Sequence, residues 1–250
     1  MSNSKENQYS GQLSAGTQGQ QSSGTVISGC LQQDSAWLDK KLAADQNFDV
    51  VTRTIEVGGR EAALYFIDGF CKDDLLQKLL QYFMDMKAQD MPGDAAQLLK
   101  KSIPYIEVDQ EKEWEKITSS ILSGIFVLLV DGYREAVLID ARSYPSRSVE
   151  EPEKDKVLRG SKDGFVETVV FNTALIRRRI RDTDLRMEMM SAGKSSKTDI
   201  VLCYMDSRVD HDFLEEIKQK IQNIRVDSLT MKQESLAECV VPGRWWNPFP

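Results

Sequence analysis

The chain has 250 residues, of which 41% are hydrophobic, so it can bury the core of one large domain or two small ones. Its formal net charge of −7 excludes nucleic acid as the main partner, because phosphate binding requires a basic face. The sequence has no long apolar run, no secretory signal and four widely spaced cysteines, which predicts a soluble chain with reduced thiols and neither a disulfide framework nor a zinc site.

The N-terminal third is predicted to pass from a disordered tail into a hairpin. Residues 1–33 are rich in Ser, Gln and Gly and bury too little apolar surface to offset the entropy of ordering. A short helix is predicted at 35–44. Two β-rich runs follow at 48–57 and 62–67, and the glycine pair at 58–59 indicates a hairpin turn between them.

The next part alternates between helices and strands. The spacing of apolar residues predicts three helices, at 73–86, 94–101 and 111–122. A short strand is predicted at 105–108, between the second and third of these helices. A second hairpin is predicted at 125–139 around Asp131-Gly132. Its first strand is apolar throughout, so it is predicted to be central and covered on both faces. These elements make up an N-terminal α/β subdomain at 34–141.

The centre of the chain is predicted to be an irregular connector at 142–160 followed by a helix. Pro145 and Pro152 push the residues before them toward extended backbone. An amphipathic helix of about 17 residues then runs from Phe165 to Arg181, with Asp163 as N-cap candidate. The stripe that defines this helix consists of Phe165, Val169, Asn172 and Thr173, Ile176 and Ile180.

Charged residues at the two ends of this helix match its dipole. Glu167 lies in the predicted first turn, and four arginines lie in the last: Arg177, Arg178, Arg179 and Arg181. At about 100° per residue three of the arginines share a sector, while Arg179 points elsewhere. One hypothesis is that the connector acids, Glu150, Glu151, Glu153 and Asp155, neutralise the arginines. The other is a binding site for a partner subunit or an anionic ligand.

The C-terminal third is predicted to form a second, smaller α/β subdomain at 161–241. Its elements after Gly193 are a buried strand, a helix, a short strand and a short helix, at 198–205, 210–221, 226–229 and 235–240. The final residues, 242–250, are rich in Pro and Trp. Paired tryptophans favour the boundary between water and lipid headgroups, although packing back on the domain is an equal alternative.

No constellation of residues supports catalysis, a metal or a cofactor. Gly193-Lys194-Ser195 looks like the end of a phosphate-binding loop, but Glu188 stands where the first glycine is required. A helical stretch is predicted before it and a strand after it, so a basic turn between helix and strand is the simpler interpretation. His211 is the only histidine and is predicted to be exposed in the first turn of a helix. We therefore predict a protein that is not an enzyme.

An irregular series of residues in the second half carries a family resemblance. The positions are Tyr144-Pro145, Arg147, Glu151-Pro152, Arg159-Gly160, Asp163 to Phe165, Glu167, Asn172, Leu175 to Arg181, Ser195 to Asp199, Tyr204 and Asn247 to Pro250. The series resembles the A-subunit family of spore germination receptors, the GerA type, over about residues 47–250. Within the family, the sequence of residues 198–204 and 245–250 is more similar to the SpoVAF branch.

The resemblance implies a fold and a cellular setting. The fold is two small α/β subdomains, each a mixed sheet packed with helices, joined by a proline-containing connector. They precede a membrane-embedded half that lies beyond this sequence, in a protein of the inner spore membrane whose N-terminal part faces the spore core. The residues carried over as interaction candidates are Arg147, Glu151, Arg159, Glu167, Asn172, Arg177, Arg178, Arg179 and Arg181.

The resemblance also implies a function that involves no catalysis. GerA-type A subunits act with a transporter-like B subunit and a lipoprotein C subunit, and oligomerise into a channel that releases ions. SpoVAF-type relatives act with SpoVA proteins and amplify germination. We therefore expect a domain for subunit assembly and signal coupling, and the alternative is a sensor that binds a small nutrient between the subdomains.

Overall fold

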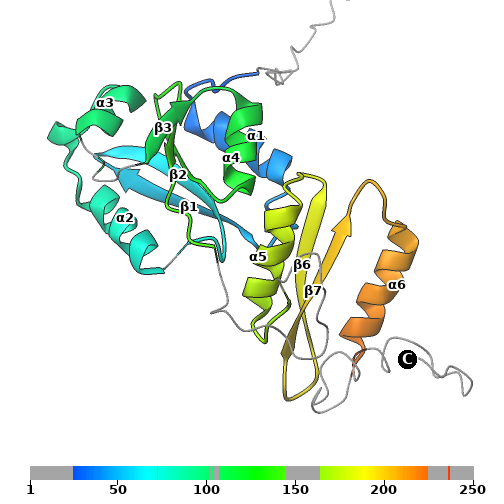
Figure 1. The fold of residues 1–250 in the computed structure, drawn as a ribbon. Helices are drawn as coiled ribbons and strands as arrows, with labels where there is room; N and C mark the ends of the chain where they lie inside the picture. Colours follow the sequence, from blue (N-terminus) through cyan, green and yellow to red (C-terminus); the bar gives the residue numbers. More distant parts are fainter. Residues whose placement is uncertain are drawn as a thin grey trace, which may run out of the picture.

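The computed structural model describes residues 25–71, 73–101, 103, 107–144, 164–224 and 236. Within them the chain forms a five-stranded sheet, in the order β1-β2-β4-β5-β3, and a separate two-stranded sheet, β6-β7 (Figure 1). Helices pack on both sheets, so the predicted α/β class with two subdomains is confirmed. We call the part built on the five-stranded sheet the first subdomain, and the part built on the two-stranded sheet the second subdomain.

The first subdomain holds most of the regular structure. Its elements are α1 (Leu31–Leu42), β1 (Val50–Val57), β2 (Arg60–Ile67), α2 (Asp73–Asp85), the 3-10 helix η1 (Ala88–Asp90), α3 (Ala95–Lys101), β3 (Val108–Glu111), α4 (Trp114–Leu122), β4 (Phe126–Val130) and β5 (Ala136–Ile139). Every pairing between these strands is antiparallel, where a mixed sheet was expected. The short turns after β1 and β4 impose this direction on the pairs β1–β2 and β4–β5, because a parallel pair needs a long crossover.

Helices cover both faces of the five-stranded sheet. Strand β4 lies at its centre and all five of its residues are buried, as its apolar sequence predicted. Val127 and Leu129 face a core shared with α1 and α4, whereas Phe126, Leu128 and Val130 face a second core shared with α2 and α3. Apolar residues are therefore required on every position of β4.

Helix α1 begins inside the segment that was expected to be disordered. Ile27 and Leu31 are buried in the first core. The Asp34 carboxylate accepts hydrogen bonds from the backbone N–H groups of Ser28 and Gly29, each at 3.0 Å, which orders the approach to the helix. Asp131, predicted only as a turn residue, accepts from the N–H of Leu31 at 3.1 Å. A few apolar residues and two carboxylates thus order a stretch of otherwise polar composition.

The second subdomain consists of α5 (Val169–Arg179), β6 (Leu185–Ala192), β7 (Thr198–Met205) and α6 (His211–Gln222). The prediction of a helical stretch directly before Gly193 is wrong, because Leu185–Ala192 form strand β6. Leu, Met and Glu favour helices locally, but all eight residues pair with β7, and this tertiary pairing overrides the propensity. Gly193, with φ of 91°, therefore begins a turn between two strands.

Strand β7 has the predicted bounds but is not buried. None of its eight residues falls in the buried class. Ile200 and Leu202 pack with α6 against a small core of Ala192, Ile221 and Ile224. A two-stranded sheet has too little area to enclose an apolar strand on both faces, which explains the difference.

Several predictions fall on residues that the structure does not describe. They concern the tail at 1–24, most of the connector, Asp163, the strand at 226–229, most of the helix at 235–240, and 242–250. Three interaction candidates, Arg147, Glu151 and Arg159, are among them. In the described part of the chain, no helix is long and apolar enough to cross a bilayer.

The turn after β2 allows helix α5 to pack closely against the first subdomain. Gly69 has φ of +80°, and a Cβ at this position would lie 3.2 Å from both Ala174 Cβ and Val170 Cγ1. Ala174 is itself part of the core that α1 and α4 share with the sheet. The absence of a side chain at residue 69 therefore permits this close approach.

We predict that Gly69→Ala lowers the free energy of unfolding by about 1–3 kcal/mol, because it combines an unfavourable φ with crowding against α5. The measurement is urea unfolding of the 250-residue chain. Gly93→Ala is the control, since no atom lies within 4 Å of a Cβ there, and should change stability by no more than about 0.5 kcal/mol. Equal effects of the two substitutions would contradict the close approach of α5.

Candidate functional site at the junction of the subdomains

Helix α5 presents to the first subdomain a face that its sequence did not predict. The helix starts at Val169 after the N-cap Thr168, and it has 11 residues. Phe165, expected in the apolar stripe, is 67% exposed. Thr173 is the one member of the predicted stripe that is buried, and the other buried residues of α5 are Ala174 and Arg177. Most of the predicted stripe was therefore wrong, because the buried face of α5 includes a charged side chain.

Arg177 does not belong to an exposed arginine patch. Its side chain is only 1% exposed, as is that of Asp49, which lies just before β1. Nε donates to Asp49 Oδ2 at 2.7 Å and Nη2 donates to Oδ1 at 3.0 Å, so the ion pair is bidentate. Nη2 also lies 3.3 Å from Asn47 Oδ1. We call Asn47, Asp49 and Arg177 the junction cluster.

Asn47 connects the junction cluster to strand β6. Its Oδ1 accepts from the N–H of Met187 at 2.8 Å, and its Nδ2 donates to the carbonyl of Leu42 at 2.8 Å. The N–H of Phe48 donates to the carbonyl of Met187 at 3.0 Å, and residues 47 and 187 form a parallel bridge. The segment before β1 therefore pairs with the edge of the second subdomain.

The junction cluster fixes the two subdomains through charge as well as shape. A guanidinium and a carboxylate removed from water are each costly unless the other is in place. The bidentate geometry further restricts the direction from which Arg177 approaches Asp49. Separation of the subdomains would leave both charges without their partner, so the junction favours one relative orientation.

Arg178 forms a second attachment at the same helix end. Its guanidinium carbon lies 4.6 Å from the centre of the Tyr144 ring, in a cation–π arrangement. Tyr144 donates its hydroxyl to the carbonyl of Ser123 at 2.9 Å and contacts the Phe70 ring edge to face. Arg178 thus contacts the first subdomain through an aromatic ring. The acids proposed to neutralise the arginines, Glu150, Glu151, Glu153 and Asp155, lie outside the described residues.

The remaining interaction candidates in the described residues are one asparagine with local hydrogen bonds and three exposed charged residues. Asn172 accepts from the N–H of Val166 at 2.7 Å and donates to the carbonyl of the same residue at 2.8 Å, which orders the approach to α5. Glu167, Arg179 and Arg181 are exposed. Arg178 and Arg179 are the last two residues of α5 and Arg181 follows them, whereas Glu167 lies just before the first residue of the helix.

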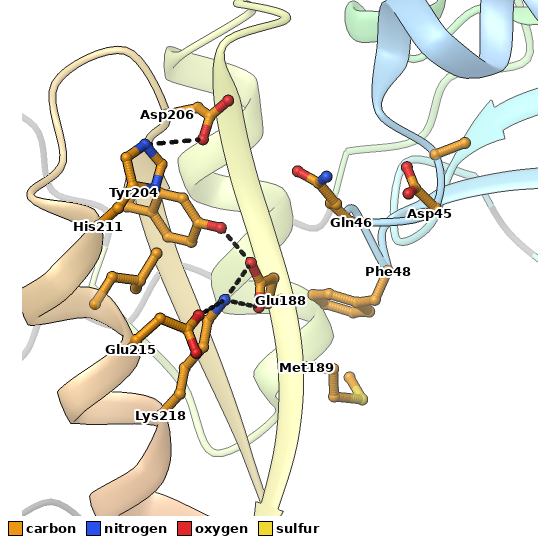
Figure 2. A pocket seen from close by; sticks show the side chains of 12 residues that line it. Asp45, Gln46, Phe48, Glu188, Met189, Tyr204, Asp206, His211, Glu215 and Lys218 are labelled. Atoms are coloured by element: carbon orange, nitrogen blue, oxygen red, sulfur yellow. Dashed lines mark hydrogen bonds and ion pairs between the residues drawn. The ribbon is translucent and has the colours of Figure 1, made fainter.

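A pocket of about 590 Å³ lies beside the junction cluster. Figure 2 shows that residues before β1 line one side of it, and that β6, β7 and α6 line the other. The lining comprises Ala44, Asp45, Gln46, Phe48, Glu188, Met189, Tyr204, Asp206, His211, Leu214, Glu215 and Lys218. Sequence reasoning missed this set, because its two sides are about 140 residues apart along the chain.

Glu188 is the centre of the polar network in this pocket. It accepts hydrogen bonds from the Tyr204 hydroxyl and from Lys218, whose Nζ lies 2.7 Å from Glu188 Oε2 (Figure 2). Partial burial raises the pKa of Glu188, but the bonds from Lys218 and Tyr204 outweigh it, so the pKa is lowered overall. Burial and the hydrogen bond to Glu188 raise the pKa of Tyr204.

Arg186 bridges the two sides of the pocket. Its Nη2 lies 3.0 Å from Asp206 Oδ2, and its Nε donates to Gln46 Oε1 at 2.9 Å. His211 is 66% exposed at the start of α6, as predicted, with Nε2 3.9 Å from Asp206 Oδ1. No group of side chains in the described residues has the arrangement of a metal site.

The pocket and the junction cluster use neighbouring residues of the same extended segments. Asn47 and Asp49 point inward to Arg177, and Phe48 between them lines the pocket. On β6, Met187 is fully buried at the junction and the next residue, Glu188, lines the pocket. Successive side chains of an extended chain point to opposite faces. Any molecule in the pocket therefore contacts the immediate neighbours of the junction cluster.

The family of the chain follows from comparison with known sequences. A family model described as Bacillus/Clostridium GerA spore germination protein matches residues 37–250. The chain belongs to this family. It is 34% identical over 219 residues to stage V sporulation protein AF of Bacillus subtilis, covering 87% of this chain and 44% of that protein. It is 28% identical to spore germination protein KA of the same organism, covering 90% and 41%.

A solved structure has the same fold. The crystal structure of the N-terminal domain of the A subunit of the Bacillus megaterium spore germinant receptor GerK3 matches with a TM-score of 0.62. The match covers 88% of this chain and 82% of that domain at 24% sequence identity. The chain spans less than half the length of the two curated GerA relatives described above. The fold predicted from the resemblance is thus confirmed.

We predict that Arg177→Met destabilises the chain by about 3–5 kcal/mol, because it leaves the Asp49 carboxylate buried without its partner. Combining it with Asp49→Leu should restore much of the loss, since the double variant buries no charge. The measurement is urea unfolding of the single and double variants.

Arg181→Met is the matched control for the junction cycle, because it removes an exposed guanidinium from the same helix end. We expect its effect to stay within about 0.5 kcal/mol. If Arg177→Met costs no more than Arg181→Met, the ion pair with Asp49 does not hold the junction.

Proposed function

We propose that this chain is a non-enzymatic domain of a spore germination protein that mediates subunit assembly and couples a signal to an ion-conducting membrane part. The observation that carries the proposal is the junction cluster, which holds two subdomains in one orientation through a buried bidentate ion pair. The identity of 34% to stage V sporulation protein AF supports a role as an amplifier of germination.

The geometry of the junction suits coupling. A relay between subunits must transmit displacement from one face to another, and a buried directional ion pair resists independent movement of the two parts. The polar network of the pocket is unsuited to general-acid catalysis, because the pKa of Glu188 is lowered. A general acid at neutral pH needs a raised pKa.

The exposed end of α5 is the proposed contact with other subunits. Arg178, Arg179 and Arg181 are exposed at its C-terminal end, and Glu167 is exposed just before its first residue. Charges at the rim of an interface give specificity and register more than affinity. The proposed partners are further copies of the chain and other germination subunits, namely a transporter-like B subunit, a lipoprotein C subunit or SpoVA proteins, at the inner spore membrane.

We predict that the double reversal Arg178→Glu/Arg181→Glu in the full-length protein slows spore germination and weakens its association with other germination subunits at least about tenfold, or 1.4 kcal/mol. The measurements are germination kinetics of spores that carry the variant and co-purification of the partner subunits. The physical reason is that the two introduced glutamates would meet the acidic groups of the partner that the arginines are proposed to contact.

Lys194→Glu is the control for this reversal, since it changes an exposed charge of the same sign in the turn between β6 and β7. Both variants should accumulate in spores at normal amounts. Lys194→Glu should unfold at unchanged temperature, and the double reversal at a slightly lower temperature because it loses the contact of Arg178 with the Tyr144 ring. Normal germination and normal association in the double variant would exclude the end of α5 as the contact surface.

The pocket supports a second candidate function, direct sensing of a small nutrient between the subdomains. Its volume of about 590 Å³ lies within the range of about 300–1,000 Å³ that small ligands occupy. Residues from both subdomains line it, with Phe48 and Met189 as apolar contacts and Glu188 and Lys218 as polar ones. A ligand there would add contacts across the junction.

We predict for this second function a saturable heat of binding in calorimetry with a panel of amino acids, sugars and nucleosides. Phe48→Ala should abolish that heat because it removes the aromatic wall of the pocket, whereas Met84→Ala, on helix α2, should preserve it. A domain that serves assembly alone gives no saturable heat with any member of the panel.

A further inference from the structure

Strand β1 forms one edge of the five-stranded sheet. In the described part of the chain it pairs only with β2, through all eight of its residues. Thr52, Arg53, Thr54 and Glu56 are exposed along it. An edge strand presents a row of backbone N–H and C=O groups that another strand can pair with. The edge is long enough for a specific pairing.

A groove of about 590 Å³ runs beside this edge. Arg53 of β1 and six residues of α2 line it: Leu76, Gln77, Leu80, Gln81, Met84 and Asp85. Leu76, Leu80 and Met84 follow each other at intervals of four, so they form one row along the helix. Met84 is 59% exposed. The edge thus combines backbone polar groups with an adjacent apolar row.

We propose that β1 pairs antiparallel with β1 of a second copy of this chain, about a twofold axis that passes through Thr54. The two five-stranded sheets would then form one continuous sheet. In a twofold pairing the same patch meets itself, so its residues must be complementary to their own sequence in reverse.

The sequence of β1 meets this requirement when Thr54 lies on the axis. Residues directly opposite each other point to the same face of the sheet. With Thr54 on the axis, Arg53 faces Ile55, Thr52 faces Glu56 and Val51 faces Val57. No two like charges are opposed, and threonine and β-branched pairs of this kind stabilise antiparallel strands. Centring the axis on Arg53 would instead set two guanidinium groups against each other.

The α2 helices agree with the same axis. A twofold axis perpendicular to the sheet keeps both helices on one face, so the row of Leu80 and Met84 on one copy meets the corresponding row on the other. The rim of the groove carries Arg53 and Asp85, which are opposite in charge. A second copy therefore offers apolar and charged groups that complement the groove. This proposal does not depend on the coupling role, because β1 pairs at an edge and not at α5.

The first test is cysteine crosslinking in the 250-residue chain with its four native cysteines changed to serine. Thr54→Cys should give a disulfide-linked dimer under mild oxidation, because opposed Cβ atoms in a pair of this kind are about 4.5–5.5 Å apart. Thr52→Cys should not crosslink, since the two copies of residue 52 would be roughly 14 Å apart along the strands. Thr52→Cys/Glu56→Cys should crosslink again.

The second test needs no cysteine. Thr54→Lys sets two ammonium groups against each other on the axis, whereas Thr52→Lys sets an ammonium against Glu56. Sedimentation should show a dissociation constant for Thr54→Lys at least tenfold higher than for Thr52→Lys, with both variants unfolding at similar temperatures.

Three outcomes would overturn the proposal. The wild-type chain could be monomeric across the micromolar to millimolar range. Folded Thr54→Cys could stay uncrosslinked, or Thr52→Cys could crosslink as efficiently, which would indicate random collision. Equal dimerisation of the two lysine variants would place the axis elsewhere.

Discussion

The ion pair between Arg177 and Asp49 is the interaction on which the arrangement of the two subdomains depends. Both side chains are almost completely withdrawn from solvent, so neither can lose the other without leaving a buried charge. The pair also places Asn47, which connects Leu42 to Met187 and thereby joins the end of α1 to β6. The small second subdomain has only a minor core of its own, and its position follows from this polar contact.

Buried side chains and side chains that line the pocket lie next to each other along the junction. Inward residues of the segment before β1 and of β6 are held by buried hydrogen bonds, while their neighbours Phe48 and Glu188 face the pocket. Because the extended backbone joins the two sets directly, a force on the pocket side is applied one residue away from the buried pair. This proximity is the physical basis of the coupling that we propose between the pocket and the relative orientation of the subdomains.

The sequence predicted local features far better than the junction. The hairpins, the apolar strand β4 and helix α2 were predictable because neighbouring residues determine them. Strand β6 was not, since its helix-favouring residues become a strand only through pairing with β7. Arg177 and Asp49 are 128 residues apart, and nothing in the spacing of the last turn of α5 distinguishes the buried arginine from its exposed neighbours. The packing of Ala174 against Gly69 and the ion pair with Asp49 together turn that face inward.

The junction and the proposed pairing between copies meet in one strand. Asp49 is followed directly by Val50, the first residue of β1, so the strand that holds the ion pair at its start is also the exposed edge. If β1 pairs with a second copy, two junction clusters are joined by a continuous pair of strands. Two extended strands that are hydrogen-bonded along their length move together, so a displacement of one strand is passed to the other. The orientation of the second subdomain in one copy would then depend on that in the other, which is the requirement for a cooperative response.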